Sequence, residues 1–448
     1  MKNKKGFTLI ELLAVIGILG VIITIAGVSV SKLMQNSKKD INKIQEKAIL
    51  SAAKAYTADN LSSCKSGCVV STDTLISSGY LDNSESISGQ IVVTKDGNKF
   101  NYEYTSTVIS GDDSINITNF EPITRNNVLT NAVKKTFKVK NSLNKKMYAK
   151  ITLNNIEISN RLKNYDFVWS LYEGNKNVSN GTFDNVGENI TLGEYLVLES
   201  NEEKTYNLYI WLEKTSVGQS SISGQFSATI QTNLENYYTS PESDFVVNSN
   251  GVLTAYTGSP GIIIIPPVVN GVTVTKIGID GNYSSILPDS GAFAEANTTI
   301  VIPNTVTKIS SMSLFGSGVD AIIIPNSVTE IGIAAIGGNN YTNISIPNSV
   351  TTLGSEAVAS NNLKSIFIPN TVTKIDGQAF ANNNLKGIII PSSVTNVSAD
   401  ETGLFWYNGD DNLIIIVQGK SSAPDTFYEG WNKKTYEGTE TFNTVYVP

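Results

Sequence analysis

The chain of 448 residues contains no histidine, and this absence excludes several kinds of active site. Ser-His-Asp and Cys-His pairs need an imidazole as general base, and many metal sites use it as a ligand. We therefore do not expect an enzyme, and the sequence predicts no catalytic residue, cofactor or metal. The acidic pair Asp410-Asp411 supplies too few oxygens for calcium and is better explained as a solvated turn.

Charge is also scarce, and this limits the class of partner. Charged residues make up 16% of the chain, against about 25% in typical soluble domains. The net charge of −7 and the pI near 5.0 argue against a nucleic-acid partner, which requires a basic patch. A surface rich in neutral polar groups is typical of displayed and secreted proteins, and the length allows about two to four domains.

A long apolar run near the N-terminus predicts a membrane anchor. From Phe7 to Val30 the only charged residue is Glu11. As a helix the run spans about 36 Å, enough for a hydrocarbon core of about 30 Å. The lysines within Met1–Gly6 keep that end cytoplasmic, so the remainder is exported. A signal peptide has a shorter apolar region followed by a cleavage site, and neither holds here.

The ten residues KKGFTLIELL at positions 4–13 resemble the class III leader of type IV pilins and pseudopilins. The resemblance implies that a prepilin peptidase removes the leader 1–6 by cutting between Gly6 and Phe7 and methylates the new N-terminus. It also implies that Glu11 meets the α-amine of Phe7 on a neighbouring pilin-like subunit, since an unpaired carboxylate in an apolar fibre core is very unfavourable. The alternative is a single-span anchor with an accidental glutamate.

Apolar residues at helical spacing continue past the membrane segment and predict one helix over residues 7–60. They form a stripe that can hold the exported part of the protein: Ile41, Ile44, Ala48, Ile49, Ala52, Ala53 and Tyr56.

Cys64 and Cys68 follow the predicted helix, in the segment 61–89. Two cysteines without histidine do not make a structural zinc site, and on the exported side a short-loop disulfide is favoured over two free thiols. Ser71 can cap a helical turn that ends at Gly79. Residues 64–82 resemble a segment of pilin-like proteins from Gram-positive bacteria.

Residues 90–240 alternate apolar and polar side chains between turns, which predicts a β-sandwich of antiparallel strands. Examples of inward positions are Met147 to Leu153, Phe167 to Leu171 and Tyr206 to Leu212 at every second residue, with turns at Gly174 and at Asn180-Gly181. The pattern is similar to that of the immunoglobulin-like domains of the camelysin and biofilm-fibre family. A metalloprotease activity proposed for some members does not transfer to a chain without histidine. A spacer is the expected role.

Residues 241–448 contain a repeat with a constant period of 22, which predicts a solenoid. The repeat is marked by five prolines, each preceded by isoleucine and followed three residues later by valine: Pro303, Pro325, Pro347, Pro369 and Pro391. Asn339, Asn361 and Asn383 share a further phase. The unit resembles the BspA-type leucine-rich repeats of bacterial surface proteins. Leu413 to Val417 is expected as the last strand, and the tail with Trp431 as a cap.

Each repeat strand contains the pattern Ile-x-Ile-Pro, and strand residues alternate between faces. The two isoleucines face the core, so the residue between them faces outward and forms a mostly apolar column: Val301, Ile323, Ser345, Phe367 and Ile389. We name this the outer column. A contiguous apolar surface often marks an interaction site. Our hypothesis is that the outer column contacts a partner, and the alternatives are strand propensity alone or cover by a neighbouring domain.

Together these features predict an α+β multidomain chain with a long pilin-like helix, a β-sandwich and a C-terminal leucine-rich-repeat β-solenoid. The expected function is that of a minor or tip subunit of a type IV pilus-like fibre that presents the repeats for adhesion to a host, matrix or cell-surface ligand. The alternatives are a pseudopilin of a secretion or DNA-uptake machine and an anchored adhesin that does not polymerise. The expected location is the cell membrane and then the bacterial surface.

Overall fold

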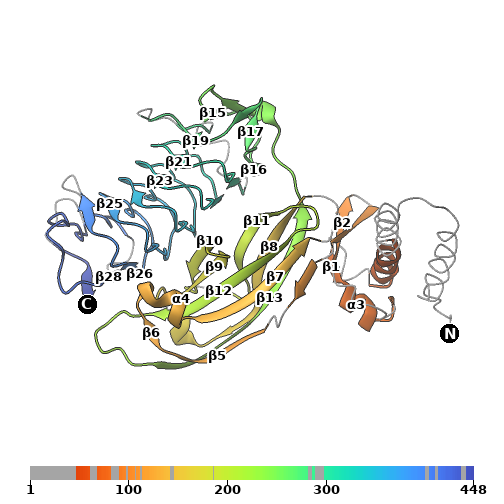
Figure 1. Cartoon of the computed structure of the whole chain (residues 1–448), viewed down its shortest axis with the longest axis horizontal. Helices are drawn as coiled ribbons and strands as arrows, with labels where there is room; N and C mark the ends of the chain where they lie inside the picture. The colour runs from red at the N-terminus through yellow and green to blue at the C-terminus, as the bar shows by residue number, and fades with distance from the viewer. Residues whose placement is uncertain are drawn as a thin grey trace, which may run out of the picture.

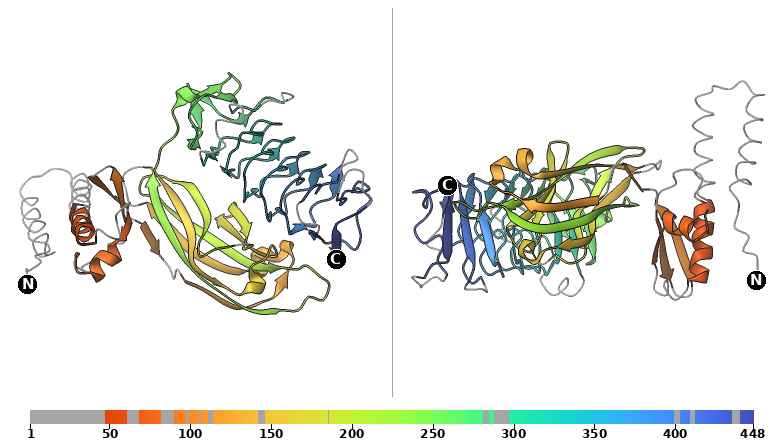
Figure 2. Two further views of the ribbon diagram at one scale, coloured as in Figure 1. Left: turned by 180° about the vertical axis from the view of Figure 1, so that it is seen from behind. Right: turned by 90° about the horizontal axis from the view of Figure 1, so that it is seen from below.

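Three modules follow one another along the chain (Figure 1). The computed structural model describes residues 47–60, 68–81, 90–96, 99–105, 107–110, 114–141, 146–184, 186–280, 285–287, 297–398, 403–408, 412–434 and 440–448. A small helix-and-sheet module comes first, a sandwich of two sheets follows, and a solenoid ends the chain. Figure 2 shows the first module at one end of the sandwich, away from the C-terminal turns of the solenoid.

The first module packs a helix over residues 47–59 against a three-stranded antiparallel sheet. The sheet contains β1 (Cys68–Ser71), β2 (Gln90–Asp96) and β3 (Lys99–Thr105), and α3 (Thr72–Ser77) joins the first two. Ile49, Ala52 and Ala53 of the predicted stripe are buried against Val70 and Leu75. The apolar spacing therefore identified the buried face of this helix. None of the helices in the described ranges is long and apolar enough to cross a membrane.

One domain boundary in the structure differs from the predicted one. β2 and β3 pair with β1, so residues 90–105 belong to the first module, whereas the sequence analysis assigned them to the sandwich. The period-two alternation is the same in both sheets, and it does not reveal which strands pair with each other. The helical turn predicted after Ser71 is confirmed as α3. Gly79 follows it with a φ of 73°, which glycine adopts without strain.

The predicted sandwich is present, with two sheets around one core. The order of the larger sheet is β10-β9-β12-β7-β4, with β6 beside β12, and that of the smaller is β11-β8-β13-β5. The strands are β4 (Thr107–Ser110), β5 (Ser114–Phe120), β6 (Pro122–Ile123), β7 (Val133–Asn141), β8 (Met147–Ile158), β9 (Phe167–Glu173), β10 (Lys176–Thr182), β11 (Ile190–Leu198), β12 (Glu203–Glu213) and β13 (Ile222–Asn236). Short helical turns η1 (Arg125–Asn127) and α4 (Val128–Asn131) connect β6 to β7, and η2 (Asn160–Leu162) precedes β9.

The predicted inward residues of the sandwich form its core. Met147, Ala149, Ile151 and Leu153 of β8 are all at most 1% exposed. One predicted turn is wrong, because Asn180 and Gly181 lie inside β10. Glycine is required at position 181 because the ring of Trp169 lies close to the backbone: a Cβ at this position would be 2.8 Å from it. The resemblance of this domain to the camelysin family stays a prediction.

The solenoid contains two rows of short parallel strands. The first row begins with an antiparallel strand and contains β14 (Phe245–Val247), β15 (Val252–Tyr256), β19 (Lys276–Ile277), β21 (Lys308–Ile309), β23 (Glu330–Ile331), β24 (Thr352–Leu353), β25 (Lys374–Asp376) and β27 (Asn396–Ser398). The second contains β16 (Ile262–Ile264), β20 (Thr299–Val301) and β22 (Ala321–Ile323), then β26 (Gly387–Ile390), β28 (Ile414–Gln418) and β29 (Asn443–Val447). η3 (Glu242–Asp244) leads into this domain, and β17 (Val268–Val269) and β18 (Val272–Thr273) form a hairpin.

The repeated asparagines bind successive turns together inside the core. The side-chain amide of Asn361 donates to the carbonyls of Ile336, Val358 and Ala359, and its oxygen accepts the N–H of Tyr341. Asn339, Asn383 and Asn408 make equivalent bonds. Trp431 is buried against Phe405 and Phe427 at the C-terminal end, as expected of a cap. The strand at Leu413 to Val417, which is β28, is not the last, since β29 pairs with it in parallel.

Candidate functional site

The residues expected to direct processing and assembly lie outside the described residues. Gly6, Phe7, Glu11 and Cys64 are among them, and Cys68 is described only as the first residue of β1. Cleavage, methylation, pairing of Glu11 and the disulfide therefore stay predictions. The site that the structure does describe is the surface of the repeat domain.

The outer column does face away from the solenoid core, but it is not free. The flanking isoleucines, such as Ile300 and Ile388, are buried in the solenoid as predicted. Val301, Phe367 and Ile389 are nevertheless only 6%, 4% and 2% exposed, and Ile323 is partly buried. The hypothesis that this column contacts an external partner is corrected here: a neighbouring domain, the sandwich, covers it. Figure 1 shows β16 and β26 on the side of the solenoid nearest the sandwich.

The four apolar members of the column all make apolar contacts with the sandwich. Val301 and Ile323 meet Tyr148 and its neighbours on the smaller sheet. Phe367 packs with Val168, Tyr209 and Trp211 on the outer face of the larger sheet. Ile389 packs with Tyr165, from the turn before β9. Each Å² of apolar surface that these contacts remove from water stabilises the association by about 25 cal/mol. This burial explains why the two domains associate.

The polar member of the column, Ser345, is matched by a polar partner. The backbone N–H of Asn180 in β10 donates to Ser345 Oγ at 2.9 Å, and the side chain of Asn180 donates to the carbonyl of Ile346, also at 2.9 Å. At this position, therefore, the sandwich matches the column in polarity.

A buried ion pair lies within the interface. Nε of Arg125 lies 2.6 Å from Oε1 of Glu213, with the two side chains 4% and 0% exposed. Both belong to the sandwich, and both reach the solenoid. Arg125 donates to the carbonyl of Ile368 and lies 4.1 Å over the ring of Phe367. Gln418, at the end of β28, donates to Oε2 of Glu213 at 2.8 Å. These directional bonds set the register between the two domains.

The sequence analysis missed the partner of the outer column, although a signal existed. Leu208 to Leu212 is an uninterrupted apolar run in β12, and such a run is typical of a strand covered on both faces. The alternating pattern taken from the same strand accounted for only one of those faces.

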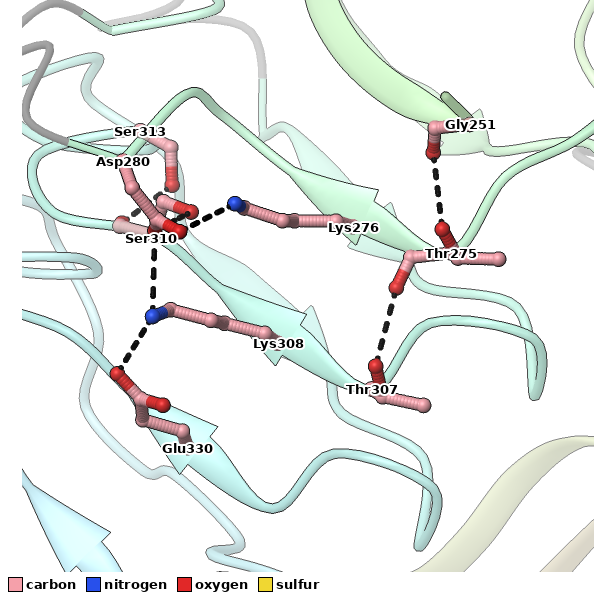
Figure 3. A network of polar contacts seen from close by, with 9 residues as sticks. All are labelled: Gly251, Thr275, Lys276, Asp280, Thr307, Lys308, Ser310, Ser313 and Glu330. Carbon is pink, nitrogen blue, oxygen red and sulfur yellow. Dashed lines mark hydrogen bonds and ion pairs between the residues drawn. The ribbon is translucent and has the colours of Figure 1, made fainter. Parts of the chain in front are cut away.

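The other row of the solenoid faces away from the sandwich and is polar (Figures 1 and 3). Lys308 lies between two carboxylates, 3.2 Å from Asp280 and 2.8 Å from Glu330. The hydrogen bond to Glu330 raises the pKa of Lys308. Lys276 donates to Asp280 at 2.5 Å, and this bond is the main cause that lowers the pKa of Asp280 to about 2.

Beside these charges runs a column of threonines, each bonded to the threonine of the preceding turn. Thr307 donates its backbone N–H to the carbonyl of Thr275 at 2.9 Å, and its hydroxyl donates to the same carbonyl. Thr329, Thr351, Thr373 and Thr395 continue the backbone ladder. The exposed row therefore presents a regular polar surface. Within the described ranges no cluster of three or more acidic or cysteine side chains is placed to hold a metal ion.

Two family models match parts of the chain. Residues 1–27 match the family described as the prokaryotic N-terminal methylation motif, and residues 289–407 match six copies of the BspA type leucine rich repeat region. The motif implies processing by a prepilin peptidase. Both resemblances inferred from the sequence are thereby confirmed, whereas no curated protein matches the chain.

Two solved structures are similar to this chain. A leucine rich cell surface protein from Faecalibacterium prausnitzii is 21% identical, with a TM-score of 0.29, over 43% of this chain and 58% of that chain. A leucine-rich repeat protein from Bacteroides ovatus is 19% identical, with a TM-score of 0.19, over 46% of this chain and 75% of that chain.

Proposed function

We propose, from the premise that this chain joins a prepilin-type N-terminus to BspA-type leucine-rich repeats, that it is a pilin-like bacterial surface protein. In this proposal it is a minor or tip subunit of a type IV pilus-like fibre and presents the repeats for adhesion or protein binding. The observation that carries the proposal is the presence of both motifs on one chain, at residues 1–27 and 289–407.

The described structure supports a presenting role. The sandwich contacts the solenoid along the outer column and through the buried Arg125–Glu213 pair, so the two domains form one continuous body. The bulk of this body fits a tip or minor position better than a densely packed fibre shaft. The polar row that contains Lys308 and Glu330 is left facing away from the sandwich (Figure 1).

Assembly in this proposal depends on Glu11. Once the leader is removed, the α-amine of Phe7 on one subunit neutralises the Glu11 carboxylate of the next, and both charges are then paired in an apolar environment. Without the amine or the acid, the remaining charge would be buried unpaired.

The experiment compares sheared fibre fractions from cells that express the wild-type chain, Glu11→Ala or Glu46→Ala. Glu46 is the matched control, because it lies on the same predicted helix beyond the apolar run. We expect the wild-type chain and Glu46→Ala in the fibre fraction, starting at Phe7, and Glu11→Ala in the membrane alone. A purified chain that starts at Met1, or unchanged incorporation of Glu11→Ala, would contradict the proposal.

The same fractions separate the anchored adhesin, and a gene deletion separates the pseudopilin. An anchored adhesin would be processed but absent from the sheared fraction for every variant. If the chain is a pseudopilin, deleting its gene would abolish protein secretion or DNA uptake and leave adhesion unchanged. We propose a binding role and not a catalytic one, because the sequence shows no convergent set of acid, base and nucleophile residues, and histidine, the most frequent general base, is absent.

A further inference from the structure

A pocket of about 180 Å³ lies where the sandwich meets the solenoid, next to the buried ion pair. It is smaller than the cavities of about 300–1,000 Å³ that hold drug-sized ligands, so it admits one small molecule and not an extended chain. The sandwich contributes its walls from η1, α4, β9 and β12, and the solenoid contributes Asn348, Phe367 and Asn370. The pocket therefore exists only while the two domains are associated.

Three aromatic side chains line the pocket and are held in place by one another and by neighbouring rings. Trp211 meets Phe367 edge to face, with ring centroids 5.8 Å apart and planes at 83°. Tyr172 meets Tyr209 in the same way at 5.5 Å. Trp211 and Phe367 are only 3% and 4% exposed, so Tyr172, which is partly buried, presents the more open aromatic surface. Because these rings are already fixed, binding a ligand against them costs little conformational entropy.

Amide side chains supply the polar part of the lining, and they too are fixed. Asn348 donates its amide to the hydroxyl of Tyr172 at 2.9 Å, and Asn370 donates to Asn126 at 3.0 Å, so each bond connects the two domains. Nε1 of Trp211 is buried and has no hydrogen-bond partner among the described residues. A ligand hydroxyl that reaches this N–H after a small side-chain shift would satisfy it.

The lining offers no uncompensated charge. Arg125 is its one charged residue, and its guanidinium is paired with Glu213 and with the carbonyl of Ile368. An anionic ligand would gain no free counter-charge here, and a cation would meet the guanidinium. The pocket therefore favours an uncharged ligand with several hydroxyl groups.

We propose that this pocket binds one neutral sugar ring, the terminal hexopyranose of a glycan. The apolar C–H face of such a ring suits the aromatic walls. Its hydroxyls can both donate to and accept from the amides, and they can accept from an indole N–H. At its rim Leu129 is 59% exposed, so the ring enters from solvent while the rest of the glycan stays outside. This inference names the class of ligand to which the proposed adhesin would bind, and its biological role rests on the proposed function.

The test is ligand-observed saturation-transfer NMR on the purified full chain in deuterated detergent. The probes are the methyl glycosides of glucose, galactose, mannose and N-acetylglucosamine, with N-acetylneuraminic acid as a charged comparison. Leu129→Trp places a larger ring at the rim without changing the core, and Val217→Trp makes the same change at a site that is 70% exposed and does not line the pocket.

We expect at least one neutral glycoside to receive saturation, with a dissociation constant on the order of millimolar, which fits a ligand of about 13–16 non-hydrogen atoms. Leu129→Trp should weaken this binding about tenfold or more at an unchanged urea midpoint, and Val217→Trp should not. The inference is overturned if no neutral glycoside receives saturation, if only the anionic sugar does, or if Leu129→Trp leaves the signal unchanged. Because the assay uses no fibres, its failure would leave the proposed function standing.

Discussion

The pair Arg125–Glu213 offers a quantitative test of how the two large domains are joined. Glu213→Gln preserves the shape of the side chain but leaves the guanidinium of Arg125 buried without a counter-charge. Removing one partner of a buried pair destabilises a protein by about 3–5 kcal/mol. Arg125→Met should lower the free energy of unfolding by a similar amount, because Glu213 is fully buried and would keep only the hydrogen bond from Gln418.

The double variant should be less destabilised than the sum of the two single variants. With both charges absent, the remaining loss is the hydrogen bond to the carbonyl of Ile368, which costs about 1–3 kcal/mol. The coupling free energy between the two positions is therefore expected to be at least about 3 kcal/mol, at the upper end of the range for residues in direct contact. Lys150→Gln is the control, since its pair with Glu194 is partly exposed and should contribute less than about 1 kcal/mol.

Urea unfolding followed by tryptophan fluorescence measures these values in both domains at once. Trp169 and Trp211 report on the sandwich, and Trp406 and Trp431 report on the solenoid. We expect a shared transition in the wild-type chain and separate transitions once the interface is weakened. Additive single variants within about 0.5 kcal/mol, or a loss below about 1 kcal/mol for either one, would refute the reasoning.

Three further predictions concern the solenoid. Asn361→Ala should lower the free energy of unfolding by about 2–4 kcal/mol, since three carbonyls and one N–H lose a buried partner, while Asn362→Ala on the surface should change it little; equal urea midpoints would contradict this. Gly387→Ala should separate the two unfolding transitions, because its Cβ would lie 2.1 Å from the ring of Tyr165, whereas a single transition at the wild-type midpoint would show that the ring moves aside freely. Asp280→Asn should destabilise the chain slightly, below about 1 kcal/mol, since the carboxylate is 56% exposed. Because the pKa of Asp280 is lowered to about 2, its ionised carboxylate stabilises the fold fully above about pH 4, and this stabilisation is lost as the pH falls towards 2. The urea midpoints of the wild-type chain and the variant should therefore converge near pH 2, and a constant difference would exclude this role.

Much of the architecture could be predicted because it repeats a local pattern. The period of 22 places Ile309, Ile331 and Leu353 in register on successive turns, and the parallel pairs found in the structure have that spacing. The buried asparagines could be located in the same way, since a solenoid turn contacts only its neighbours. The outward residue before each of these apolar positions, such as Lys308 or Glu330, was available from the same period and was overlooked.

The candidate site was predicted only in part. Sequence alternation placed Val301, Phe367 and Ile389 on the outside of the solenoid correctly, and it named cover by a neighbouring domain as an alternative. It could not choose between that cover and an external partner, because the residues that settle the question, Trp211 and Tyr165, are more than 150 positions away from Phe367 and Ile389, which they contact. The ion pair is equally distant from its solenoid contacts, with 243 positions between Arg125 and Ile368.

The sequence by itself determined a methylation motif from KKGFTLIELL, a sandwich from alternation, and a solenoid from a fixed repeat. These features follow from interactions between residues that are close along the chain or one period apart. Only the tertiary structure decided that the sandwich covers the outer column, that residues 90–105 belong to the first module, and that a pocket forms between two domains. Those outcomes depend on which apolar surfaces meet in space, and the spacing of apolar residues along the chain does not determine this.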